Sequence, residues 1–108
     1  KSSAASDVYK RQALANKTGG LSGPAIKPIA VRMVYQAANA VSIPIIGMGG
    51  IACAEDALEF ILAGASAVSI GTANFFNPYA AEETVQGIEA YMREKKVDRL
   101  TDLIGIVK

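Results

Sequence analysis

The sequence predicts an α/β fold with two short parallel strands, each ending in a glycine turn and each followed by a helix. The first strand lies within residues 43–51, where an apolar, β-branched run too short for a helix ends in Gly-Met-Gly-Gly. The second covers residues 67–70 and ends at Gly71-Thr72. Because right-handed β-α-β connections make such strands parallel neighbours, both glycine turns are expected at one edge of the sheet.

This arrangement is typical of the last part of a (β/α)8 barrel, where the loops after strands seven and eight often hold a phosphate. A complete barrel takes about 250 residues, whereas this sequence has 108. The sequence therefore predicts part of a (β/α)8 TIM barrel, comprising strands seven and eight with their flanking helices. Such a partial barrel leaves a strand edge and an apolar face uncovered, so self-association or poor solubility is expected.

The first two helices are predicted from apolar residues that recur at helical spacing. The first begins at Pro24. Its inward stripe comprises Ile26, Ala30, Met33, Ala37 and Val41. The second covers residues 55–63 and ends at Gly64, with Cys53 at its N-cap. Cys53 is interpreted as a small half-buried filler rather than a functional thiol.

A short helical turn over residues 72–76 precedes the third helix, for which Asn77-Pro78 is the expected start and Lys95 the approximate end. Its inward stripe comprises Ala81, Val85, Ile88 and Met92. The apolar residues 100–107 are expected to form a last helical turn that packs on the outside of the barrel.

Composition narrows the classes of function. Eleven Lys and Arg against ten Asp and Glu give a net charge of +1, so no nucleic-acid or membrane surface is expected. The sequence has no histidine and one cysteine, so no metal site is predicted, and chemistry would need a cofactor, a carboxylate, a lysine or a partner chain. The apolar runs are shorter than the roughly 20 residues that span a bilayer. With no secretion signal evident, a cytoplasmic location is the expectation.

The two glycine turns are the candidate binding site. Glycine lets backbone amides approach a phosphate because no Cβ intervenes, and Thr72 adds a hydroxyl at a helix start. Either turn alone is more often only a turn. Together, at Gly49-Gly50 and Gly71-Thr72, they predict a phosphate site.

The charged residues nearby are given simpler interpretations. Lys27 and Arg32 are expected to be solvated residues on the outer face of the first helix. Asp56 and Glu59 resemble a paired acid-base set, but they are expected on an amphipathic helix outside the pocket.

Three motifs carry a resemblance to a known family. They are Thr-Gly-Gly-Leu-Ser-Gly-Pro-Ala-Ile-Lys-Pro at residues 18–28, Pro-Ile-Ile-Gly-Met-Gly-Gly at 44–50, and Ala-Gly-Ala-Ser-Ala at 63–67 followed by Gly-Thr-Ala-Asn-Phe at 71–75. In this order they resemble the C-terminal third of the catalytic subunit of dihydroorotate dehydrogenase, and most closely its NAD-linked class 1B branch. The resemblance covers residues 13–108. Residues 1–12 instead resemble sequencing-adapter read-through and are predicted to be a non-native tail, with a native polar tail as the alternative.

The resemblance implies an FMN-containing (β/α)8 barrel that oxidises (S)-dihydroorotate to orotate in pyrimidine biosynthesis. It implies that FMN, chiefly its phosphate and ribityl chain, is contacted by Gly23, Gly49, Gly50, Gly71 and Thr72. It also implies a homo-oligomeric parent enzyme and a second subunit whose FAD and iron-sulfur cluster pass electrons to NAD. The family's cysteine base, flavin-contacting lysine and orotate-binding asparagines belong to upstream strands. No catalytic residue is therefore predicted here, and the fragment alone is expected to be inactive.

Two other interpretations stay open from the residues alone. A phosphate-binding barrel lyase or isomerase, acting on a phosphorylated sugar, would share the glycine turns but would not require the motif at residues 18–28. A non-catalytic half-barrel that pairs with another chain to bury its open edge would be compatible with the absence of histidine and of a catalytic cysteine.

Overall fold

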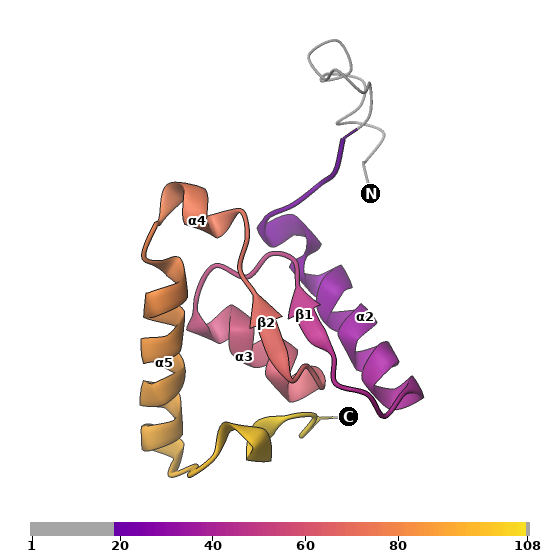
Figure 1. The fold of residues 1–108 in the computed structure, drawn as a ribbon, viewed down its shortest axis with the longest axis vertical. Coiled ribbons are helices and arrows are strands. Elements are labelled where there is room, and N and C mark those ends of the chain that lie inside the picture. The colour runs from indigo at the N-terminus through magenta and orange to yellow at the C-terminus, as the bar shows by residue number, and fades with distance from the viewer. Residues whose placement is uncertain (1–18, 108) are drawn as a thin grey trace.

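The computed structural model describes residues 19–107, so the predicted tail at residues 1–12 lies outside the described part. The elements in chain order are η1 (Pro24–Ile26), α2 (Lys27–Ala40), β1 (Ile46–Met48), α3 (Ala54–Ala63), β2 (Ala67–Ser69), α4 (Ala73–Phe76), α5 (Ala80–Lys95) and η2 (Leu100–Leu103). Helix α3 contacts both strands, and α2 and α5 pack on either side of α3 (Figure 1). None of the described helices has the length and apolar character needed to cross a membrane.

The two strands pair in parallel, as the sequence predicts. Their register places Ile46 opposite Ala67, Gly47 opposite Val68 and Met48 opposite Ser69. The strands are shorter than the apolar runs that predicted them, because only these three pairs of residues form the ladder. Helix α3 connects them, so the glycine turns that follow both strands lie at the same edge of the sheet (Figure 1).

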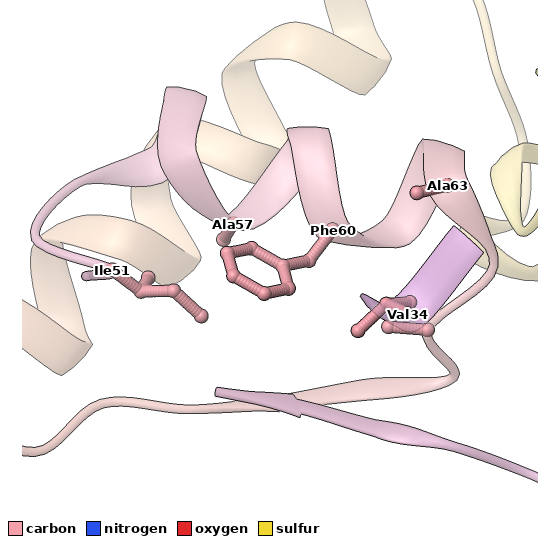
Figure 2. Packing of buried hydrophobic residues seen from close by; sticks show 6 residues of the cluster. Val34, Ile51, Ala57, Phe60 and Ala63 are labelled. Atoms are coloured by element: carbon pink, nitrogen blue, oxygen red, sulfur yellow. The ribbon is translucent and has the colours of Figure 1, made fainter. Parts of the chain in front are cut away.

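The main core lies between α3 and the strands. Phe60 is fully buried, and a Cβ at Gly47 of β1 would lie 2.6 Å from its ring. Figure 2 shows the Phe60 ring between Ile51 and Val34 on one side of α3. The buried cluster comprises Val34, Ile51, Ala57, Phe60, Ala63 and Ala65. The missing side chain at position 47 therefore allows α3 to pack closely on the strand.

A second cluster joins α3 to α5 and to the C-terminal segment. Its buried members are Leu58, Ile61 and Leu103. The backbone N–H of Gly105 donates to the carbonyl of Ile61 at 2.9 Å, so the segment after η2 is held on α3. The expected last helical turn is present over residues 100–103, while its place on the outside of a barrel stays a prediction. Gly87 of α5 faces Ala54 of α3 with no room for a Cβ, which brings these two helices close together.

The predicted inward stripes of α2 and α5 are wrong in part. In α2, Met33 and Val41 are exposed, while Val34 and Ala38 are buried. In α5, Ala81 and Val85 are exposed, while Ala80 and Thr84 are buried. Apolar residues lie on more than one side of each helix, so periodicity alone selected a stripe about one residue away from the side that packs.

The predicted burial of Cys53 and the predicted start of the third helix need correction. Cys53 is the N-cap residue of α3, but its thiol is exposed rather than half-buried. Helix α5 begins at Ala80 rather than at Asn77-Pro78. Asn77 instead stabilises the turn before α5, because its Oδ1 accepts a hydrogen bond from the Tyr79 N–H at 3.1 Å and its Nδ2 donates to Glu83 at 2.9 Å.

The face of the sheet opposite α3 is uncovered within residues 19–107. Ile46 and Met48 of β1 are 60% and 58% exposed, and their partners Ala67 and Ser69 are exposed as well. This agrees with the expectation of an uncovered apolar face. A covering layer for these side chains would have to come from outside the described residues.

Lys27 joins the start of α2 to the start of α3. Its Nζ lies 2.6 Å from Oδ1 of Asp56 and 2.8 Å from Oε2 of Glu59. The prediction that Lys27 is a solvated residue is therefore wrong. Asp56 and Glu59 are three residues apart on α3 and present their carboxylates on one side, and α2 lies against that side.

The pairing shifts the pKa values of two of these groups. Hydrogen bonds from Lys27 to Asp56 and Glu59 raise the pKa of the Lys27 ammonium above its usual value. Partial burial of Asp56 acts to raise its pKa. Hydrogen bonds from the Lys27 ammonium, the Ala52 N–H and the Cys53 thiol outweigh that effect, so the pKa of Asp56 is lowered overall.

Replacing Gly47 with alanine should lower the free energy of unfolding by about 1–3 kcal/mol, because the added methyl group would displace Phe60 from the core. Equilibrium urea denaturation would measure this loss. Gly20→Ala is the matched control, since a Cβ at Gly20 would have no neighbouring atom within 4 Å. An equal loss in both variants would contradict the packing role of Gly47.

Replacing Lys27 with methionine should lower the free energy of unfolding by about 1–2 kcal/mol near neutral pH, since the ion pair with Asp56 is only partly exposed. The lowered pKa of Asp56 gives stability above its unfolded value of about 4, and this is lost as the pH falls through the folded value. The raised pKa of Lys27 gives stability below its ordinary value of 10.5, and this is lost as the pH rises through the folded value.

The difference in free energy of unfolding between the original chain and Lys27→Met should thus be constant from about pH 5 to about pH 9.5 and shrink outside that window. Urea denaturation at a series of pH values would measure it. A difference that persists undiminished in acid would show that the packing of the lysine stem, rather than its charge, provides the stability.

Candidate functional site

The glycine ends of the two strands open into a pocket of about 360 Å³. Three segments contribute to its walls: residues 22–26 before α2, residues 48–52 from the last residue of β1 onward, and residues 69–76 from the last residue of β2 through α4. All of the residues predicted for cofactor binding line it, namely Gly23, Gly49, Gly50, Gly71 and Thr72. The fold therefore brings the predicted residues together from three separate parts of the chain.

Gly49 and Gly50 meet two demands of the fold itself. Their φ angles are +115° and +77°, a backbone region that favours glycine. A Cβ at Gly50 would also lie 2.7 Å from the carbonyl oxygen of Gly23 and 2.9 Å from Cβ of Lys27. The close backbone approach predicted for this turn is present in the structure, and it is made to the start of α2.

Gly71 differs, because the described protein gives no reason for glycine there. Its φ lies outside the left-handed region, and a Cβ at this position would have no atom within 4 Å. Gly71 nevertheless lines the pocket. Glycine at this position keeps the pocket wall free of side-chain atoms, which is what close approach by a ligand requires.

A hydrogen bond between two hydroxyl groups connects two walls of the pocket. Thr72 Oγ1 donates to Ser22 Oγ at 3.2 Å. Thr72 immediately precedes α4, as the short turn predicted from residue 72 implied. Ser22 was not among the predicted site residues, although its hydroxyl beside Gly23, within the motif at residues 18–28, was a signal that could have identified it.

The lining of the pocket is mostly apolar, with a few hydroxyl groups, and it carries no charged side chain within residues 19–107. Ser22, Ser69 and Thr72 contribute hydroxyl groups, and Met48 and Phe76 contribute apolar surface. Met48, Ser69 and Phe76 were not predicted to line the pocket. The sequence could have predicted this for Met48 and Ser69, because each is the last residue of its strand, next to the glycine turn. The two residues also pair with one another in the ladder.

No catalytic acid or base is evident in this lining. Cys53 is not among the lining residues, and its thiol lies 3.4 Å from Oδ2 of Asp56. Arg32 lies beside a shallower hollow formed by α2, α3 and Val107. Within residues 19–107 no group of three or more acidic or thiol side chains is arranged to hold a metal ion. The described part of the site is suited to binding rather than to proton transfer.

Comparison with known proteins connects this pocket with one family. The family model described as dihydroorotate dehydrogenase matches residues 2–92. The match includes most of residues 1–12, whose non-native origin stays a prediction.

Curated relatives agree with the family model. The chain is 69% identical over 100 residues to the dihydroorotate dehydrogenase B (NAD(+)) catalytic subunit of Lachnoclostridium phytofermentans, covering 93% of this chain and 33% of that protein. It is 59% identical over 100 residues to the corresponding subunit of Alkaliphilus metalliredigens, covering 92% and 33%. The chain thus spans about a third of the length of these relatives.

A solved structure of dihydroorotate dehydrogenase from Eimeria tenella, in complex with ferulenol, superposes with a TM-score of 0.77 at 30% identity. The superposition covers 85% of this chain and 26% of the Eimeria tenella chain. The ligand-free form of the Eimeria tenella protein gives the same TM-score. The sequence comparisons and the structural superposition point to the same family, and the family model covers most of the 108 residues. This chain therefore belongs to the dihydroorotate dehydrogenase family.

Proposed function

We propose that this chain forms the C-terminal third of a dihydroorotate dehydrogenase B catalytic subunit and supplies part of its FMN site. The high identity to subunits of that name supports the assignment. We further propose that β1 and β2 are strands seven and eight of a (β/α)8 barrel. The parallel pair, the single covered face and the common edge of both glycine turns support this placement.

The observation that carries the cofactor proposal is the glycine at position 71. Its backbone conformation and its neighbours would allow a side chain, yet it lines the pocket with bare backbone. A phosphate group held by backbone amides and hydroxyls fits this lining, because such a group needs close approach rather than a neighbouring cation.

The residues proposed to hold FMN by its phosphate and ribityl chain are Gly23, Gly49, Gly50, Gly71 and Thr72. The bound flavin would supply the redox chemistry for oxidation of (S)-dihydroorotate to orotate in pyrimidine biosynthesis. The part played by this chain is to bind and orient that cofactor. The group that removes the substrate proton would come from the remainder of the enzyme, since no suitable side chain lines the described pocket.

The names of the relatives also support the presence of a second, partner subunit. They are catalytic subunits of an NAD(+)-linked enzyme, which implies a further subunit. We propose that this subunit carries FAD and an iron-sulfur cluster and passes electrons to NAD, in a cytoplasmic assembly with more than one copy of the catalytic chain. The exposed face of β1, with Ile46 and Met48, would be covered by the rest of the barrel.

The assignment is tested on the full-length protein that contains this chain. Purified with FMN, it should show flavin absorbance that bleaches when dihydroorotate is added without an electron acceptor. A folded, colourless protein indifferent to both compounds would contradict the assignment and would favour a barrel that binds a phosphorylated sugar.

In the same protein, Gly71→Ala should raise the Kd for FMN by about tenfold or more, because the methyl group occupies the space that the ligand must enter. Quenching of FMN fluorescence on binding would measure the Kd. Gly20→Ala, the same change at an open position outside the pocket lining, should leave the Kd within about twofold. Equal Kd values for both variants would remove Gly71 from the binding site.

A further inference from the structure

Lys27 and Asp56 both contact the segment that follows β1. The stem of Lys27 packs against Gly50, since a Cβ at Gly50 would lie 2.9 Å from Cβ of Lys27 and 3.1 Å from its Cα. Oδ2 of Asp56 accepts a hydrogen bond from the N–H of Ala52 at 3.0 Å. Both Gly50 and Ala52 line the pocket.

The ion pair closes this arrangement. Lys27 Nζ donates to the second oxygen of the same carboxylate, Asp56 Oδ1, at 2.6 Å. One carboxylate therefore holds the backbone of the turn with one oxygen and the first residue of α2 with the other. Ser22 and Gly23 precede η1, which runs directly into α2, so the same contact fixes the opposite wall of the pocket.

We propose that Lys27 is a positioning residue for the FMN site, holding the turn after β1 and the loop before α2 at the spacing that the cofactor requires. This inference rests on the FMN-binding function proposed above. Lys27 does not itself line the pocket, and its ammonium group is directed at two carboxylates on α3. Its effect on the cofactor is therefore exerted through Gly50 and the adjoining loop.

The third wall of the pocket is linked to the same loop. Ser22 accepts the hydrogen bond from Thr72, which follows β2. A shift of the loop before α2 would thus change the distance between all three walls. Pocket walls that are already held in place bind a ligand more tightly, because less conformational entropy is lost on binding. Loss of the Lys27 charge should accordingly weaken FMN binding even when the protein remains folded.

The experiment uses the full-length protein, with Kd values for FMN measured by fluorescence quenching under conditions where each variant is folded by circular dichroism. Lys27→Met, which keeps most of the apolar stem, should raise the Kd about tenfold. Lys27→Arg keeps the charge and should restore the Kd to within about threefold of the original protein. Arg32→Met removes an exposed cation from the same helix and should have an effect below about twofold.

The two partners of Lys27 provide a sharper control. Asp56→Asn should weaken FMN binding, whereas Glu59→Gln should change the Kd by less than about twofold, because Glu59 shares Lys27 but makes no hydrogen bond to the turn. The double variant Lys27→Met with Asp56→Asn should raise the Kd for FMN by about as much as the more damaging single substitution, because both substitutions remove the same ion pair.

The outcomes separate this inference from the function on which it rests. If the original protein does not bind FMN, the proposed function fails. If it binds FMN and Lys27→Met binds equally well, only the positioning role fails. A lowered unfolding temperature with an unchanged Kd would assign Lys27 a structural role alone and would overturn the inference.

Discussion

The packing of α3 on the strands depends on a contact that only glycine allows. The Phe60 ring lies where a side chain of residue 47 would otherwise be, so the helix approaches the backbone of β1 directly. That approach fixes the connection from β1 through α3 to β2 and makes the two strands parallel neighbours. The common edge at which the pocket forms is a consequence of this connection, as is the position of α3 between α2 and α5.

Glycines around the pocket serve different physical purposes although they look alike in the sequence. Gly50 is required by its positive φ and by the closeness of the Gly23 carbonyl. At Gly71 neither the φ angle nor a neighbouring atom requires glycine. The remaining reason for glycine at this position is that a side chain would enter the pocket. The distinction matters because substitution at the first position disturbs the fold as well as the site, whereas substitution at the second tests the site alone.

Much of the fold could be predicted from the sequence because its signals are local. The two apolar runs, the glycine at position 64 and the glycine turns predict strands, helix ends and a shared edge without reference to other segments. The docked sides of α2 and α5 could not be predicted in this way, since close contacts such as Gly87 against Ala54 select them. The pairing of Lys27 with Asp56 was missed for the same reason, because the two residues are brought together only when α2 packs on α3.

The uncharged lining of the pocket also determines how the site would respond to its surroundings. Hydroxyl groups and backbone amides do not titrate between about pH 5 and pH 9, so this part of the site presents the same donors throughout that range. A phosphate monoester changes its own charge near pH 6. Any pH dependence of affinity that arises at these walls would therefore report the ionisation of the ligand. Its dependence on ionic strength would be weaker than that of a site built from lysine and arginine.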